Sequence, residues 1–325
     1  MLDCAWSPDS RRLAIAGGEG RVFLATFPGD ALQVRAIGEH AMGALAVARQ
    51  PRTARFATSG QDNAIALWDG EDGSERRRWR PAMAWTEHLA WSPDGARLAS
   101  AAGKQLTLWS PEGEKQHAFA PHAGAIAALG WDKPGRDLAA ATNGAMVVHR
   151  VEPPRFEMRQ YKWPASCQTV AFSGNGRVLA TGMQDGSVHF WYLSSGKDSQ
   201  MRGYPGKVHL TAWTGNSRYL ATNAGNDLVL WDFGGKGPEG SKPLRLSGHT
   251  DRIECLAAQP NGPHLVSGGR DWRIALWCPG KAKQALDAHL ADSEPTCVRW
   301  SPDGRHVAVG ERQGGLTIFE LVQIA

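Results

Sequence analysis

Residues 249–278 read HTDRIECLAAQPNGPHLVSGGRDWRIALWC and carry four spaced polar or aromatic residues, His249, Ser267, Asp271 and Trp277. Two alternating apolar runs and a Pro-Asn-Gly turn lie between them, and this arrangement predicts three antiparallel strands. A second copy occurs upstream, because His40 and Asp62 are separated by the same 22 residues as His249 and Asp271. In both copies a tryptophan follows the aspartate by six residues. Equal spacing over different intervening residues indicates an internal repeat.

The repeat can be followed through the whole chain by the last apolar pair of its third predicted strand. The second residue of that pair is Ala25, Trp68, Trp109, His149, Trp191, Trp231, Trp277 and Phe319. These positions define eight copies with an average period of 42 residues. A period of about 40–45 residues with four strands per unit is typical of β-propeller blades. Turn sequences such as WSPDG at 91–95 and at 300–304 recur at the same place in the repeat.

The pattern resembles that of the WD40-repeat β-propeller family over nearly the whole chain. The segments that carry the resemblance are SGGRDWRIALW (267–277), TSGQDNAIALWD (58–69), TGMQDGSVHFWY (181–192) and the Gly248-His249 pair. The resemblance implies an all-β WD40-type β-propeller of eight four-stranded blades, with seven blades as the alternative. It also implies a single domain over residues 1–325, with repeats at about 2–38, 39–80, 81–120, 121–161, 162–203, 204–247, 248–287 and 288–325.

In this family a buried His, Ser or Thr, Asp and Trp form a hydrogen-bonded tetrad that ties the strands of one blade together. Carried over by position, the complete structural tetrads are His40, Thr58, Asp62 and Trp68, and His249, Ser267, Asp271 and Trp277. Blade 5 keeps Thr181, Asp185 and Trp191 but has Trp163 at the histidine position. Blade 4 keeps His122, whereas Ala140 and His149 replace the serine and the tryptophan.

The two ends of the chain bear on how the ring closes. Residues 2–6 already match the innermost strand of blade 1, and only ELVQIA follows Phe319. We therefore expect three strands in the last blade. Either side-chain packing closes the ring, or the true start of the protein lies upstream.

Composition excludes several classes of protein. With 42% apolar and 21% charged residues the chain is typical of soluble globular proteins. No apolar run approaches 18 residues, so we expect no membrane span, and no signal peptide opens the chain, although an upstream start would reopen that question. A net charge of +4 does not indicate nucleic acid as the ligand. Five cysteines without a C-x-x-C pair predict inert, buried thiols and a cytoplasmic location.

No catalytic constellation is present in the sequence. There is no H-E-x-x-H or G-x-S-x-G motif, and the Ser-His-Asp set belongs to the tetrad, where we expect it to be buried and saturated. We therefore predict no enzyme activity and no cofactor or metal. The alternative is a propeller enzyme or metal-binding protein that uses the central channel, since His88 shares the repeat position of Cys255. The tops of the inner strands argue against that alternative, because they read Ala44, Trp85, Ala125, Ser166, Lys207 and Arg252.

The tryptophans point to a binding face. Ten of the 14 occupy two repeat positions, which leaves Trp79, Trp85, Trp163 and Trp272. The last three map to one rim together with Lys207, Arg252 and Arg270, and exposed aromatic and arginine residues are typical of interaction hot spots. We predict a non-catalytic protein–protein interaction platform, or scaffold, that binds a protein or peptide of acidic character on the face of the tetrad histidines. Its predicted partner-binding residues are Trp85, Trp163, Lys207, Arg252, Arg270 and Trp272. The alternative, that each is an isolated surface residue, remains open, and the oligomeric state is not predicted.

Overall fold

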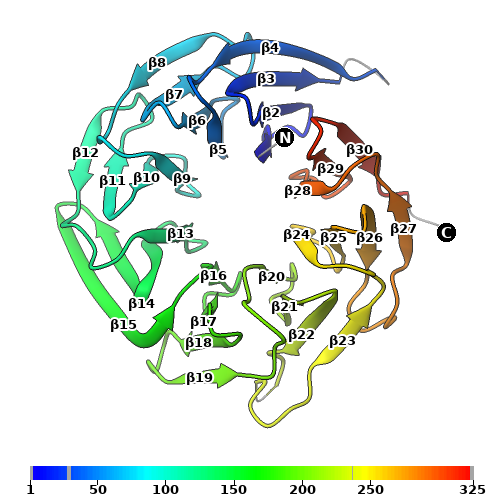
Figure 1. Ribbon diagram of the computed structural model, residues 1–325. Coiled ribbons are helices and arrows are strands. Elements are labelled where there is room, and N and C mark those ends of the chain that lie inside the picture. The colour runs from blue at the N-terminus through cyan, green and yellow to red at the C-terminus, as the bar shows by residue number, and fades with distance from the viewer. Residues whose placement is uncertain (1–2, 28–30, 236, 323–325) are drawn as a thin grey trace.

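The computed structural model describes residues 3–27, 31–235 and 237–322. Eight antiparallel sheets are arranged as blades around a central channel (Figure 1). The first strand of each blade faces the channel and the last lies on the circumference. The eight-bladed prediction is therefore confirmed, and the seven-bladed alternative is wrong. Over the described ranges the chain forms no helix long and apolar enough to cross a membrane.

Blades 1 to 4 occupy the first half of the chain. Their strands are β1 (Asp3–Trp6), β2 (Arg12–Ala16), β3 (Arg21–Thr26), β4 (Gln33–Glu39), β5 (Ala44–Arg49), β6 (Phe56–Gly60), β7 (Ile65–Trp68), β8 (Glu75–Trp79), β9 (Thr86–Trp91), β10 (Leu98–Ala102), β11 (Gln105–Trp109), β12 (Lys115–Ala118), β13 (Ile126–Trp131), β14 (Asp137–Glu152) and β15 (Arg155–Ser166). The long β14 pairs with β13 through its first half and with β15 through its second. It folds back on itself, because the Val151 N–H donates to the Arg136 carbonyl oxygen at 2.7 Å. Because β14 serves as both the second and the third strand, blade 4 is four-stranded like its neighbours.

Blades 5 to 8 complete the ring. Their strands are β16 (Ala171–Phe172), β17 (Val178–Gly182), β18 (Val188–Tyr192), β19 (Asp198–Met201), β20 (Thr211–Trp213), β21 (Tyr219–Ala224), β22 (Asp227–Asp232), β23 (Leu244–Ser247), β24 (Ile253–Ala258), β25 (Leu265–Gly269), β26 (Arg273–Trp277), β27 (Asp287–Leu290), β28 (Pro295–Trp300), β29 (His306–Glu311) and β30 (Leu316–Glu320). Among the described residues blade 8 has three strands, β28 to β30, as predicted.

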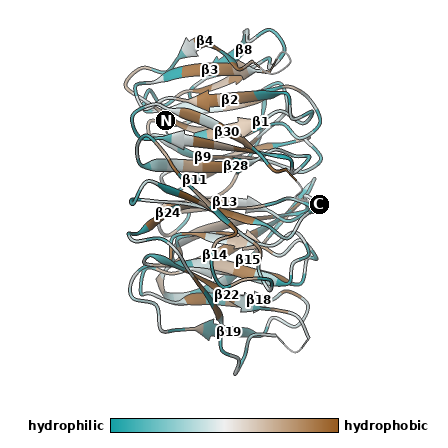
Figure 2. Ribbon diagram, turned by 90° about the vertical axis from the view of Figure 1, so that its right-hand side faces the viewer, coloured by the Kyte–Doolittle hydropathy of each residue, from teal (hydrophilic) through white to brown (hydrophobic). Residues whose placement is uncertain are grey.

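Apolar side chains fill the spaces between neighbouring blades. Figure 2 shows hydrophobic stretches along the strands and hydrophilic loops on the two faces of the disc. The inner-strand tryptophans add a hydrogen bond at several of these boundaries. Trp91 Nε1 donates to the Ala48 carbonyl oxygen of blade 2, and Trp300 Nε1 donates to the Ala257 carbonyl oxygen of blade 7. Each such tryptophan therefore ties its blade to the preceding one.

The same contact closes the ring between blades 8 and 1. Trp6 Nε1 donates to the Arg299 carbonyl oxygen at 3.0 Å, and the Arg299 guanidinium lies 2.7 Å from the Asp3 carboxylate. Cys4 and Cys297 lie together in the apolar cluster at this boundary. The described part of the chain thus closes by side-chain packing. Of the predicted first strand at 2–6, Leu2 lies outside the described residues.

Candidate interaction face

The structure brings the four residues of each complete tetrad together. In blade 7 the Trp277 Nε1 donates to Ser267 Oγ at 2.8 Å, Ser267 Oγ lies 2.8 Å from His249 Nε2, and His249 Nδ1 lies 2.9 Å from Asp271 Oδ1. Because a carboxylate only accepts, His249 carries its proton on Nδ1 and accepts from the serine through Nε2. Burial by itself raises the pKa of Asp271, but the hydrogen bonds from His249 and the Thr250 N–H outweigh it and lower that pKa.

Blade 2 repeats this geometry with threonine in place of serine. Trp68 Nε1 donates to Thr58 Oγ1 at 2.8 Å, and Thr58 Oγ1 lies 2.8 Å from His40 Nε2. His40 Nδ1 lies 3.0 Å from Asp62 Oδ1. With its donors and acceptors paired inside the blade, the set has no free nucleophile or base for catalysis. The tetrad therefore serves to hold the strands and the loops above them.

Two blades without a complete tetrad form other hydrogen bonds between residues at the tetrad positions. In blade 6 Trp231 Nε1 donates to the Tyr204 hydroxyl at 2.7 Å, and that hydroxyl lies 2.8 Å from Thr222 Oγ1. In blade 4 His122 Nε2 lies 3.0 Å from His149 Nε2. Burial, followed by the charge of His122, lowers the pKa of His149 to about 3. In blades 4 and 6 these hydrogen bonds take the place of those that the tetrad forms in blades 2 and 7.

One backbone feature is common to all eight turns between second and third strands. Each turn contains one residue with positive φ: Gly20, Asn63, Gly103, Gly144, Gly186, Gly225, Trp272 and Gly314. Glycine and asparagine adopt this left-handed conformation readily, whereas for a bulky residue it is an outlier. Trp272 has φ 63° and its side chain is 49% exposed. Packing in the fold therefore gives no reason for an indole at this position.

Charged side chains surround Trp272 on the rim of blade 7. Arg252 Nε and Arg270 Nε lie 2.7 and 2.6 Å from the same Glu254 Oε1. Burial raises the pKa of Glu254, but the two arginines outweigh it and lower that pKa. Glu294 Oε1 lies 2.8 Å from Arg312 Nη2 and 3.8 Å from Arg270 Nε. Three arginines thus share two glutamates, and the group keeps an excess of positive charge.

The predicted partner-binding residues fall into separate groups. Lys207, Arg252, Arg270 and Trp272 lie on blades 6 and 7, where the Arg270 N–H donates to the Arg252 carbonyl oxygen at 2.9 Å. Trp85 precedes β9 of blade 3, on the opposite side of the ring, and is 47% exposed.

Trp163 lies in β15, half-buried, with its ring centroid 3.9 Å from that of His189. It therefore contributes mainly to packing between blades 4 and 5.

Two exposed methionines near Trp85 were not predicted. Met83 lies in the same loop as Trp85, and Met42 lies in the equivalent loop of blade 2. Flexible, polarizable methionine side chains are common on surfaces that bind proteins. The sequence feature that could have identified these two methionines is an apolar residue in the loop before the first strand of a blade. The face thus has one apolar group on blades 2 and 3 and a mixed aromatic and arginine group on blade 7.

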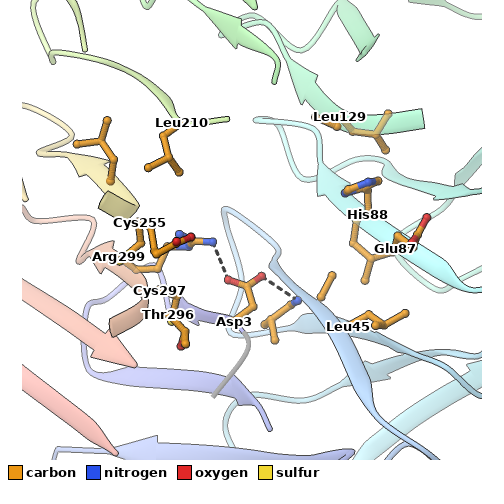
Figure 3. A pocket seen from close by; sticks show the side chains of 16 residues that line it. Asp3, Leu45, Glu87, His88, Leu129, Leu210, Cys255, Thr296, Cys297 and Arg299 are labelled. Carbon is orange, nitrogen blue, oxygen red and sulfur yellow. Dashed lines mark hydrogen bonds and ion pairs between the residues drawn. The ribbon is translucent and has the colours of Figure 1, made fainter. Parts of the chain in front are cut away.

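The central channel contains a cavity of about 420 Å³. Figure 3 shows His88, Glu87, Cys255, Cys297, Asp3 and Arg299 around it. His88 lies in the channel as its repeat position predicts, and burial lowers its pKa. Within the described part of the chain no three His, Cys, Asp or Glu side chains are placed to hold a metal ion. Asp3 is engaged by Arg299 at 2.7 Å and by the Val47 N–H at 3.2 Å.

Parts of the chain are similar in sequence to known proteins. A family model described as WD domain, G-beta repeat, matches residues 159–192, 240–278 and 280–319. THO complex subunit 3 of Arabidopsis thaliana is 31% identical over 141 residues, which cover 43% of this chain and 44% of that protein. Cell division cycle 20.1, cofactor of APC complex, from the same plant is 24% identical over 273 residues, 74% of this chain and 56% of that protein. Protein FIZZY-RELATED 3 of Arabidopsis thaliana is 23% identical over 226 residues, 66% of this chain and 45% of that protein.

The chain spans about half the length of the curated relatives it matches. Eight blades with a repeat of nearly constant length, the tetrad geometry and the matched repeats agree with one another. The chain thus carries WD40 repeats at three matched places, folds as an eight-bladed β-propeller, and in both respects is similar to proteins of the WD40-repeat family.

Proposed function

We propose that this chain is a non-catalytic protein-interaction platform that binds a protein or peptide partner across the face carrying the tetrad histidines. The observation that carries the proposal is Trp272, a half-exposed indole at a backbone position where the other blades have glycine or asparagine. A bulky residue in the left-handed region costs about 1–2 kcal/mol. Backbone strain of this kind is common at ligand-binding positions, where function offsets it.

The second apolar group on the face extends the proposed contact across the channel. Met42, Met83 and Trp85 lie on blades 2 and 3, opposite blades 6 and 7, and all three are exposed. A partner that contacts both groups must cross the mouth of the channel. An extended segment or a folded surface of ordinary interface size spans such a face.

The charge on blade 7 favours a partner of acidic character. Arg252 and Arg270 keep more than two fifths of their side chains exposed although both contact Glu254. The exposed donors of these guanidinium groups suit carboxylates. Lys207 is exposed on the neighbouring blade and adds a positive charge.

The names of the relatives are consistent with this role. One relative is named as a subunit of the THO complex, and another as a cofactor of the APC complex. Both names describe proteins that work in assemblies. For this chain we infer the general role of a scaffold in an assembly and not a particular complex.

Capture of partners from the native source tests the proposal. Trp272→Ala and Trp85→Ala should each reduce the capture of the same partner, and the double variant should reduce it further. Met158→Ala is the matched control, because Met158 is 63% exposed on β15, an outer strand of the circumference. A partner lost equally with all three variants, or with none, would contradict the proposed face.

A further inference from the structure

Two cysteine thiols meet at the boundary between blades 8 and 1. Cys4 lies in β1 and Cys297 in β28, and their Sγ atoms are 3.8 Å apart although 293 positions separate them in the sequence. Both side chains are buried. The sulfur atoms of a disulfide are about 2.05 Å apart, so this pair needs to approach by only about 1.7 Å to be joined.

Contacts on both sides of the pair hold β1 and β28 in place. The Arg299 carbonyl oxygen accepts from Trp6 Nε1 at 3.0 Å, and the Arg299 guanidinium lies 2.7 Å from the Asp3 carboxylate. Asp3 directly precedes Cys4, and Arg299 follows Cys297 by two residues. Because the backbone is fixed on both sides, the sulfur atoms approach through rotation of their side chains.

The repeat does not require a cysteine at either position. Cys4 stands two residues before the inner-strand tryptophan, where blades 3, 4 and 8 have leucine or valine: Leu89, Leu129 and Val298. Cys297 stands three residues before that tryptophan, where blade 4 has Ala128. Aliphatic side chains fill both places in other blades, so packing alone gives no reason for two cysteines that meet.

Cys297 is reached from the central channel, whereas Cys4 lies behind it. Cys297 and Arg299 line the cavity of about 420 Å³, and Figure 3 shows them on the same wall. Cys4 belongs to the apolar cluster between the blades, which also contains Trp6 and Ile15. A cavity of this volume admits molecules of the size of water. A small neutral oxidant such as hydrogen peroxide therefore reaches the Sγ atom of Cys297 first.

The electrostatics of the pair make Cys297 the nucleophile. The hydrogen bond from the Cys4 thiol lowers the pKa of Cys297, burial opposes this effect, and the charge of Arg299 lowers that pKa further. The same hydrogen bond, together with burial, raises the pKa of Cys4. Because the thiolate is the form that attacks, the proton stays on Cys4 and the reactive sulfur is the one that faces the channel.

We propose that Cys4 and Cys297 form an oxidation site at which a small peroxide produces a disulfide between blades 8 and 1. The Cys297 thiolate attacks one oxygen of hydrogen peroxide, the O–O bond breaks, and hydroxide leaves, which gives a sulfenic acid on Cys297. The Cys4 thiol then attacks the sulfenic sulfur, the S–OH bond breaks, and water leaves with the proton of Cys4. The hydroxide takes up the proton that Cys297 released on ionisation. Two thiols are thus oxidised, and one peroxide is reduced to two water molecules.

The disulfide has a structural consequence because it joins residues that are 293 positions apart. A cross-link over so long a segment restricts the unfolded chain strongly. Oxidation should therefore raise the melting temperature by about 5–10 °C. The sequence alone predicts inert thiols for all five cysteines, and the proposal departs from that prediction for this pair.

Peroxide oxidation of the full chain tests the site. The native protein is treated with a small excess of hydrogen peroxide, the remaining thiols are alkylated, and the digest is analysed by mass spectrometry without reduction. We expect a peptide pair linked through Cys4 and Cys297, the loss of two of the five thiols, and the increase in melting temperature. Dithiothreitol should restore all five thiols and the original melting temperature.

Two variants separate the two steps of the reaction. Cys4→Val introduces the side chain that blade 8 has at this repeat position, and Cys297→Ala introduces the alanine of blade 4, so both should fold. With Cys4→Val the sulfenic acid of Cys297 should persist and be trapped by dimedone. With Cys297→Ala the thiol of Cys4 should stay reduced, because the residue that faces the channel is gone.

Cys255→Ala is the matched control. Cys255 occupies the same repeat position as Cys297 and lines the same cavity, but its Sγ atom lies against the carbonyl oxygens of Gly268 and Pro295. Burial raises the pKa of Cys255. The variant should therefore form the disulfide at the wild-type rate, within about twofold. Trp272→Ala should also oxidise like the wild type, so the test is independent of the proposed function.

Three results would overturn the proposal. The first is that all five thiols survive peroxide at a concentration that oxidises glutathione. The second is that the linked peptides join Cys297 to Cys255 or to a second copy of the chain. The third is that Cys4→Val loses two thiols to a disulfide as the wild type does.

Discussion

Blades 7 and 8 are neighbours with the same repeat, but different residues hold them together. Blade 7 has the complete tetrad of His249, Ser267, Asp271 and Trp277. In blade 8 the corresponding positions are Ala291, Val309, Gln313 and Phe319. There the Glu311 carboxylate accepts from the Ser293 N–H at 2.9 Å, from Ser293 Oγ at 3.2 Å and from Thr317 Oγ1 at 3.3 Å.

The difference between these two blades shows which feature of the tetrad is essential. In both blades a buried carboxylate, at the end of the second strand or in the turn after it, accepts hydrogen bonds from the loop before the first strand. A buried carboxylate is stable only when donors surround it. Blade 8 meets this requirement from the end of β29, whereas blade 7 meets it from the turn that follows β25. Both blades need a buried carboxylate surrounded by donors, but the residue that supplies the carboxylate differs between them.

The largest effect is expected when the tetrad of blade 7 is broken. Asp271→Ala leaves His249 without its acceptor and should lower the free energy of unfolding by about 1–3 kcal/mol. Gln313→Ala changes the equivalent position of blade 8, where the side chain is exposed, and should cost roughly 0–0.5 kcal/mol. Urea unfolding of both variants measures the difference. Equal effects would mean that the tetrad does not stabilise blade 7.

A somewhat smaller loss is expected for the acceptor of blade 8. Glu311→Ala removes the group to which Ser293 and Thr317 donate and should cost about 1–2 kcal/mol. Glu320→Ala is the control, because Glu320 is exposed at the end of the same blade. Thermal unfolding compares the two. A change at Glu311 no larger than the change at Glu320 would show that blade 8 is held by apolar packing alone.

Amide hydrogen exchange measures how the missing strand affects the whole blade. Residues 296–321 and the facing strand β1 should exchange about tenfold faster than β24 to β26 of blade 7, a difference of about 1.4 kcal/mol in opening free energy. The reason is that β30 has an open edge and half-buried apolar residues. Uniform protection through all eight blades would contradict this expectation.

The smallest effect concerns the turn of each blade between the second and third strands. Trp272→Ala should leave the melting temperature nearly unchanged, because alanine retains the left-handed backbone and the indole is half-exposed. Trp272→Gly should raise the free energy of unfolding by about 0.5–1 kcal/mol, since glycine adopts positive φ without strain. Gly314, the equivalent residue in blade 8, already has this advantage. A fall of several degrees in either variant would show that the indole packs the blade.

Much of the architecture could be predicted from the sequence because its cause lies within one repeat. The nearly constant period predicts blades of similar size, and the count of copies predicts eight of them. The tetrad residues of blades 2 and 7 are brought together by strands of one sheet, so their spacing in the chain alone predicts their contact. The three strands predicted for blade 8 agree with those of the described residues.

Other features depend on contacts between elements with no fixed spacing in the sequence. Tyr204 occupies the histidine position of blade 6, 18 residues before Thr222, but the repeat pattern does not predict that a tyrosine hydroxyl there accepts from Trp231. Glu311 replaces an aspartate in blade 8 from the end of a strand, away from the repeat position, so periodicity could not identify it. The repeat also gives Trp163 and Trp272 the same rim, but neighbouring side chains cover more of Trp163 than of Trp272, which is 49% exposed.

The sequence by itself determined the number of blades, the order of their strands and the residues that bond within a blade, because each of these follows from local spacing. Only the tertiary structure decided that Arg252 and Arg270 share Glu254, that Trp85 lies across the ring from Trp272, and that β30 is recessed between β4 and β27. The shared Glu254 lies within blade 7 but depends on side-chain conformations that no spacing in the sequence specifies. The other two relations are set by the closure of the ring, which fixes where different repeats lie relative to one another, whereas a periodic pattern describes only the residues of one repeat.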